Sequence, residues 1–105
     1  MELNNVVFKL GTIGHYCATK AVAEKMQADV EFQRFITSSL HRFHGGDWGE
    51  MSNDDKKSNN EALEYGDRIL ARYENLNYKP IYIVADAKAE NNLRLAVTIM
   101  FPEEY

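Results

Sequence analysis

Two histidines and an aspartate follow one another at a spacing of three, at His41, His44 and Asp47. Residues three apart share one side of a helix, and imidazole and carboxylate groups are common metal ligands. A simpler interpretation exists, because histidines near the end of a helix complement its dipole without a metal. Further ligands of the usual kind are not evident in the sequence. We therefore predict no metal and no cofactor, and a metal-dependent enzyme is the least favoured hypothesis.

A second chemically capable pair is Cys17 with the nearby His15, which could supply a nucleophile and its base. Nearness in sequence does not bring two side chains together, and free cysteines are among the most buried residues. Gly11 and Gly14 follow a β-prone run, but the Gly-Lys-Ser/Thr ending of a phosphate-binding loop is missing. We predict no catalytic residues and a protein that is not an enzyme.

The only tryptophan, Trp48, lies among three glycines in the segment Gly45-Gly46-Asp47-Trp48-Gly49. One interpretation is structural: the indole anchors the loop onto the sheet, as large aromatic side chains commonly do. The other is functional, since an exposed tryptophan is a typical anchor for a protein partner. Acidic residues flank this loop and begin the next helix. The predicted partner-binding residues are Asp47, Trp48, Glu50, Asp54 and Asp55.

Three helices are expected to position these residues. Thr19 is a plausible N-cap for a short helix over residues 20–26, and Asp29 for a second that ends at Gly45-Gly46. The second helix is the clearest, because one helical stripe is apolar: Phe32, Phe35, Ile36, Leu40 and Phe43. Ser52 starts a third helix that ends at Gly66, with Asp54 and Asp55 at its favourable dipole end.

Strands are expected on both sides of these helices. Residues 6–10 form a short β-prone run, and residues 12–17 could continue it as a bent strand or a loop. Apolar and polar residues alternate over 68–73, 81–85 and 93–101, with Leu95 and Val97 on one face and Arg94 on the other. The fold class predicted is α+β: a single domain over residues 1–105 in the order β-α-α-α-β-β-β, with an antiparallel sheet and the helices packed on one face.

Composition limits the classes of partner. The 105 residues carry 16 acidic and 12 basic side chains, a formal charge of −4 that disfavours direct contact with nucleic acid. The apolar runs are far shorter than the roughly 20 residues of a membrane span. The N-terminus has no signal-peptide pattern, so we expect a cytoplasmic protein without a membrane partner. A core of this size is also compatible with a homodimer.

Several segments resemble an uncharacterised family of small bacterial proteins found on plasmids, phages and other mobile elements. The similarity includes Gly46-Asp47-Trp48-Gly49-Glu50, Asp54-Asp55-Lys56, Arg68-Ile69-Leu70 and Phe101-Pro102-Glu103-Glu104-Tyr105. The resemblance implies no enzymatic activity. It favours a small protein that binds and blocks host machinery, such as an anti-CRISPR or anti-restriction inhibitor whose partner is a host protein complex. The alternative hypothesis is a domain that binds a small ligand or nucleotide between sheet and helices.

Overall fold

The computed structural model describes residues 9–105. Its elements follow the order β1 (Thr12–Ala18), α2 (Lys20–Ala28), α3 (Val30–His44), α4 (Asn53–Tyr65), β2 (Ile69–Tyr73), β3 (Ile81–Ala85) and β4 (Leu93–Met100). Two short 3₁₀ turns, η1 (Glu90–Asn92) and η2 (Pro102–Glu104), precede and follow β4. The predicted α+β class and its β-α-α-α-β-β-β order are confirmed.

The four strands form one sheet in the order β1-β4-β3-β2. β2 with β3 and β3 with β4 are antiparallel pairs, as short connections require, whereas β1 runs parallel to β4. The sheet is therefore mixed, and the antiparallel arrangement expected for the whole sheet holds for its three C-terminal strands. The parallel pairing is possible because the three helices provide a long crossover between β1 and the strands that follow.

The helices begin at the residues expected, and α3 and α4 also end there, whereas α2 continues to Ala28, two residues beyond its predicted end. The side chains of Thr19, Asp29 and Ser52 each accept a hydrogen bond from the first turn of α2, α3 and α4. Gly66 ends α4 in the left-handed conformation, with a φ of 81° that a glycine adopts without strain. These local signals account for the clear helix boundaries.

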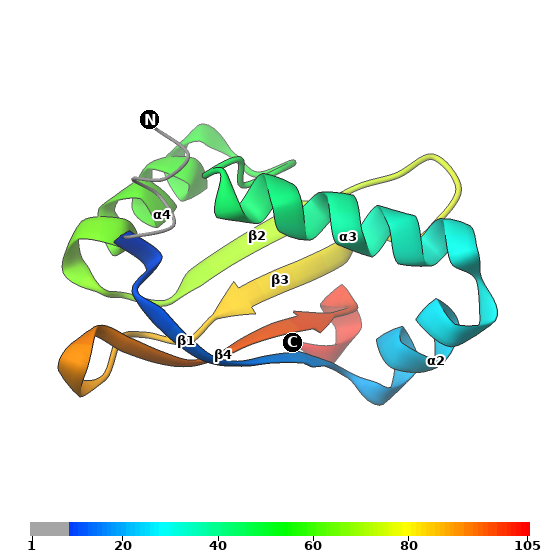
Figure 1. The fold of residues 1–105 in the computed structure, drawn as a ribbon. Helices are drawn as coiled ribbons and strands as arrows, with labels where there is room; N and C mark the ends of the chain where they lie inside the picture. Colours follow the sequence, from blue (N-terminus) through cyan, green and yellow to red (C-terminus); the bar gives the residue numbers. More distant parts are fainter. Residues whose placement is uncertain (1–8) are drawn as a thin grey trace.

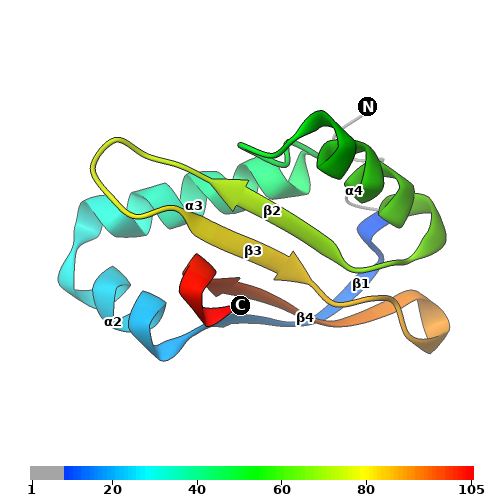
Figure 2. The same cartoon turned by 180° about the vertical axis from the view of Figure 1, so that it is seen from behind.

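One hydrophobic cluster joins the helices to the sheet. α3 crosses one face of the sheet, and α4 lies beside β2 (Figure 1). The buried residues of α3 include Phe32, Phe35, Ile36 and Phe43, which pack with alternate residues of the strands such as Ile83. Within residues 9–105, no α-helix crosses β3 or β4 on the opposite face, which Figure 2 shows. None of the described helices is long and apolar enough to cross a membrane.

Two expectations about the strands are wrong at the residues that the structure describes. Of the β-prone run 6–10, residues 6–8 lie outside the described residues, and Lys9 and Leu10 are helical. The first described strand is instead β1. In β4, Arg94 is fully buried and Leu95 is exposed, the reverse of the alternation predicted. The guanidinium of Arg94 is covered because backbone carbonyl groups from four segments of the chain surround it.

Candidate functional site

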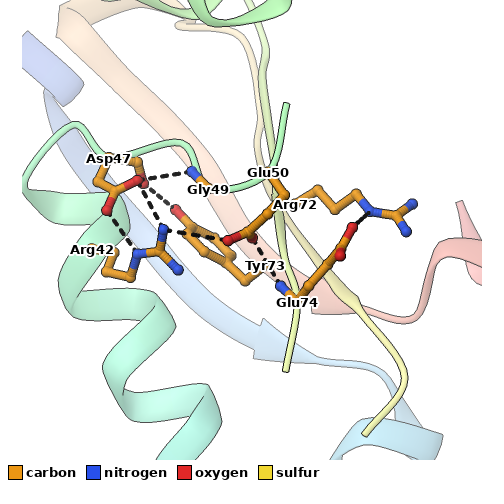
Figure 3. A network of polar contacts seen from close by, with 7 residues as sticks. All are labelled: Arg42, Asp47, Gly49, Glu50, Arg72, Tyr73 and Glu74. Atoms are coloured by element: carbon orange, nitrogen blue, oxygen red, sulfur yellow. Dashed lines mark hydrogen bonds and ion pairs between the residues drawn. The ribbon is translucent and has the colours of Figure 1, made fainter. Parts of the chain in front are cut away.

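The loop between α3 and α4 is held by an ion pair at the end of α3. The Nε of Arg42 donates to Asp47 Oδ2 at 2.7 Å, and its guanidinium lies 3.7 Å from the carboxylate of Glu50 (Figure 3). The hydrogen bond from Arg42 holds the pKa of Asp47 below its ordinary value and raises the pKa of Arg42. Asp47 also accepts from the backbone N–H of Gly49 at 3.0 Å. Its carboxylate is thus engaged in shaping the loop.

Tyr73, at the end of β2, also holds this loop in place. Its hydroxyl donates to the backbone carbonyl of Asp47 at 2.7 Å, and the Arg42 guanidinium lies 5.0 Å from the centre of its ring. Burial raises the pKa of the Tyr73 hydroxyl, which therefore stays a hydrogen-bond donor. The backbone at Gly49 has a φ of 78°, and a side chain there would collide with the Arg72 carbonyl. Glycine is required because the loop runs directly against β2.

The consequence is that the outer edge of β2 is hydrogen-bonded along its length. The N–H of Arg72 donates to the Trp48 carbonyl at 3.2 Å, and the N–H of Glu50 donates to the Arg72 carbonyl at 2.7 Å. Two residues earlier, the side-chain amide of Asn59 bonds both the N–H and the carbonyl of Leu70. A loop and one side chain thereby replace a fifth strand. We call the set Trp48–Glu50 with Asn59 the edge cap.

Trp48 is part of the core. Only 2% of its surface is exposed, its ring meets Phe43 edge-on at 5.4 Å, and its indole N–H donates to the side chain of Asn60 at 2.9 Å. An exposed anchor for a partner, one of the two interpretations of this residue, is therefore wrong. The structural interpretation is confirmed: the indole closes the loop onto the domain.

The remaining predicted partner-binding residues divide into two groups. Glu50 accepts from the N–H of Glu74 at 2.9 Å and so belongs, with Asp47, to the contacts that hold the cap (Figure 3). Asp54 and Asp55 lie exposed in the first turn of α4, where their charge suits the helix dipole. Neither forms an ion pair with another described residue. These two remain accessible to a partner.

The histidine candidates do not converge on a metal. His44 Nε2 is hydrogen-bonded to the Tyr16 hydroxyl at 2.8 Å, and burial followed by repulsion from His41 lowers its pKa. Asp47 faces Arg42 instead. Within residues 9–105, no three His, Cys, Asp or Glu side chains are grouped as metal ligands. His15 and Cys17 lie exposed on β1 and face the same side of the strand, since they are two residues apart.

Two surface hollows could accept a small molecule. One, of about 390 Å³, lies beside Tyr78 and Phe101 and is flanked by Lys25 and Lys79. Lys79 is paired with Glu103 at 3.2 Å, and the Lys25 ammonium lies over the ring of Tyr78. The second is a shallow groove along the outer side of α3. Neither lies between the sheet and the helices, where the ligand-binding hypothesis places its pocket.

The main structural residue that sequence reasoning missed is Arg94. Its guanidinium donates to the carbonyls of Leu10, Ala62, Asp67 and Asp86, at distances of 2.7 to 3.2 Å. Burial lowers its pKa, and the four carbonyl acceptors replace the water that a buried charge loses. It thereby ties the segment before β1 to the end of α4. No sequence pattern marks such a role, because an arginine among alternating residues is typical of a solvated face.

No protein-family model, no curated protein and no solved structure matches this chain. The resemblance to a family carried on mobile elements therefore stays a prediction. The fold supplies a physical reason for many of the residues on which that resemblance depends. Asp47, Trp48, Gly49 and Glu50, which belong to the first of the similar segments, build and hold the edge cap.

Proposed function

We propose that this chain is a non-enzymatic, cytoplasmic binding protein that inhibits a host defence complex by contact through α4. The observation that carries the proposal is Tyr65, a large aromatic side chain with 80% of its surface exposed at the end of a firmly held helix. Tyrosines at the centre of an interface commonly supply much of its binding energy.

The outward stripe of α4 combines this tyrosine with acidic groups. Asp54, Glu61 and Tyr65 are separated by seven and four residues, which places them on one side of the helix. α4 contains four acidic and two basic residues, so its net charge is −2. A basic patch on a partner protein is the complementary surface, and attraction between the two would speed their encounter.

The edge cap makes this stripe a rigid surface. Asn59 and Asn60 anchor α4 to β2 and to Trp48, and Ala62 and Leu63 are buried beneath it. A helix fixed in this way loses little conformational freedom on binding, which improves affinity. The choice of a defence complex as partner rests on the mobile-element resemblance of the sequence.

The direct test adds the purified protein to DNA-cleavage reactions of CRISPR effector complexes and restriction nucleases. We expect inhibition of at least one, and a loss of about tenfold or more in potency for Tyr65→Ala. Leu76→Ala is the matched control, since Leu76 is also a fully exposed apolar residue but lies in the β2–β3 loop. If the protein inhibits none of these reactions, the proposed inhibitory function is wrong. If Tyr65→Ala and Leu76→Ala lose inhibitory potency equally, the α4 surface is not the binding site.

A small-ligand-binding domain is the second candidate, favoured by the 390 Å³ pocket. Its volume falls within the usual range for ligand sites, and aromatic rings beside ammonium groups suit a flat molecule with an anionic group. Native mass spectrometry of the protein purified from its own host separates the candidates. A stoichiometric small mass that disappears in Lys25→Met would favour the ligand-binding domain, and the apo mass alone would count against it.

A further inference from the structure

β1 forms the edge of the sheet opposite the capped strand. It pairs with β4 along one side, and no other described segment pairs with its outer side. Six of its seven residues are exposed, including Tyr16 with 53% of its surface accessible. Unpaired strand edges of this length are sites where another strand can add.

The backbone groups available at this edge can be assigned from one hydrogen bond. Thr19 donates its N–H to the Ile99 carbonyl on β4 at 3.0 Å. Because backbone groups alternate in direction along a strand, His15 and Cys17 also turn theirs toward β4. The N–H and carbonyl groups of Tyr16 and Ala18 therefore face outward.

The edge also lacks the features that usually prevent association. β1 has the sequence Thr-Ile-Gly-His-Tyr-Cys-Ala, without lysine, arginine, acid or proline. Native edge strands are commonly protected by such charges or by proline. Although the whole chain carries a net charge of −4, two copies could approach along β1 without facing like charges on the strand itself.

We infer that β1 pairs with β1 of a second copy, antiparallel and about a two-fold axis at His15. His15 is the middle residue of the strand, so this register alone pairs all seven positions. It sets large residues against small ones: Tyr16 lies opposite the partner's Gly14, whose missing side chain leaves room for the ring. The remaining pairs are Thr12 with Ala18 and Ile13 with Cys17.

The opposite edge limits this assembly to two chains. Because Asn59, Trp48 and Glu50 satisfy the outer groups of β2, a dimer joined through β1 ends on both sides at a capped strand. A two-fold contact of this kind is closed and does not continue into a fibre. The inference goes beyond the proposed function and is independent of it, since α4 lies beside the capped edge.

Cysteine cross-linking tests the register directly. The two His15 residues would form a non-hydrogen-bonded pair with Cα atoms about 4.5 Å apart, within the range of a disulfide. In a Cys17→Ser background, His15→Cys should form a covalent dimer with oxidised glutathione as the oxidant, seen on a non-reducing gel. Thr12→Cys and the natural Cys17 face other residues and should stay monomeric. If the Tyr16→Cys variant forms a covalent dimer and the His15→Cys variant does not, the proposed register is wrong.

Sedimentation velocity over a range of concentrations tests the dimer without cross-linking. The natural chain should show a reversible dimer. Ala18→Lys should raise the dissociation constant of this dimer by about tenfold or more, because two ammonium groups would enter the strand pair. Tyr65→Lys introduces the same charge on α4 and should leave the dimer unchanged. Circular dichroism establishes that each variant is folded. A chain that stays monomeric at every concentration would overturn the inference.

Discussion

The two edges of the sheet are finished in opposite ways. At β2, a loop backbone and one asparagine side chain satisfy the outward N–H and carbonyl groups, so that no further strand can add. At β1, none of the described residues takes that role, six of the seven residues are exposed, and the strand contains no lysine, arginine, aspartate or glutamate. Both strands are short and lie at equivalent positions, so the difference comes from the segments around them.

This difference changes the significance of the most distinctive part of the sequence. A tryptophan among glycines and acids is typical of a binding loop, yet here Asp47, Trp48 and Gly49 are all engaged within the domain. Asp47 holds Arg42, Gly49 allows close approach to β2, and Trp48 fills the core. The surfaces that we propose for partners, β1 and the outer side of α4, have ordinary sequences. In this chain, the segment of unusual composition protects the β2 edge of the sheet.

The largest expected effect comes from removing the centre of the cap. Trp48→Ala would leave a cavity against Phe43 and an unpaired acceptor on Asn60, and we expect a loss of about 3–5 kcal/mol in the free energy of unfolding. Urea denaturation at a concentration where the chain is monomeric measures it. The matched substitution on the other edge is Tyr16→Ala, which should cost about 1 kcal/mol or less. Similar losses for the two variants would contradict the difference between the edges.

A smaller effect, with a second readout, is expected at the side chain that completes the cap. Asn59→Ala removes both hydrogen bonds to Leu70 and should cost about 1–3 kcal/mol. It also exposes the β2 edge, so a chain with two free edges should form species larger than a dimer in sedimentation experiments. Ser58→Ala, on the exposed side of the same helix, should change neither quantity. Destabilisation without further association would show that Asn59 stabilises α4 but does not block pairing.

The elements of the fold could be predicted because their signals are local. The apolar stripe of α3, the caps Thr19, Asp29 and Ser52, and Gly66 each act within a few residues of the chain. The alternation over β3 and most of β4 was equally informative. Contacts between distant segments were not predictable in this way. The parallel pairing of β1 with β4 and the cap on β2 join residues that are 11 to more than 80 positions apart.

The candidate site was predictable only as a set of neighbours in sequence. Asp47, Trp48 and Glu50 do lie together, but the pattern could not show whether they face solvent or the domain. That depends on Arg42, Tyr73 and Asn60, whose side chains reach them from other elements. Arg94 is the clearest case, since its four carbonyl acceptors come together only when the chain folds.

The smallest effect concerns the charge that holds the cap. Because Arg42 lowers the pKa of Asp47 in the folded state, this carboxylate stabilises the fold above its unfolded pKa of about 3.9 and ceases to do so as the pH falls through the lowered value. The substitution Asp47→Asn keeps the shape of the side chain but removes its charge, and with it this contribution to stability. The variant should be less stable by at most about 1 kcal/mol near pH 7, since Asp47 is half exposed, and the difference should disappear on acidification below about pH 4. Asp29 also has a lowered pKa, so the difference between the two proteins, and not either pH profile alone, reports on Asp47. Unfolding curves that stay equally separated at every pH would mean that the cap depends on the shape of this side chain and not on its charge.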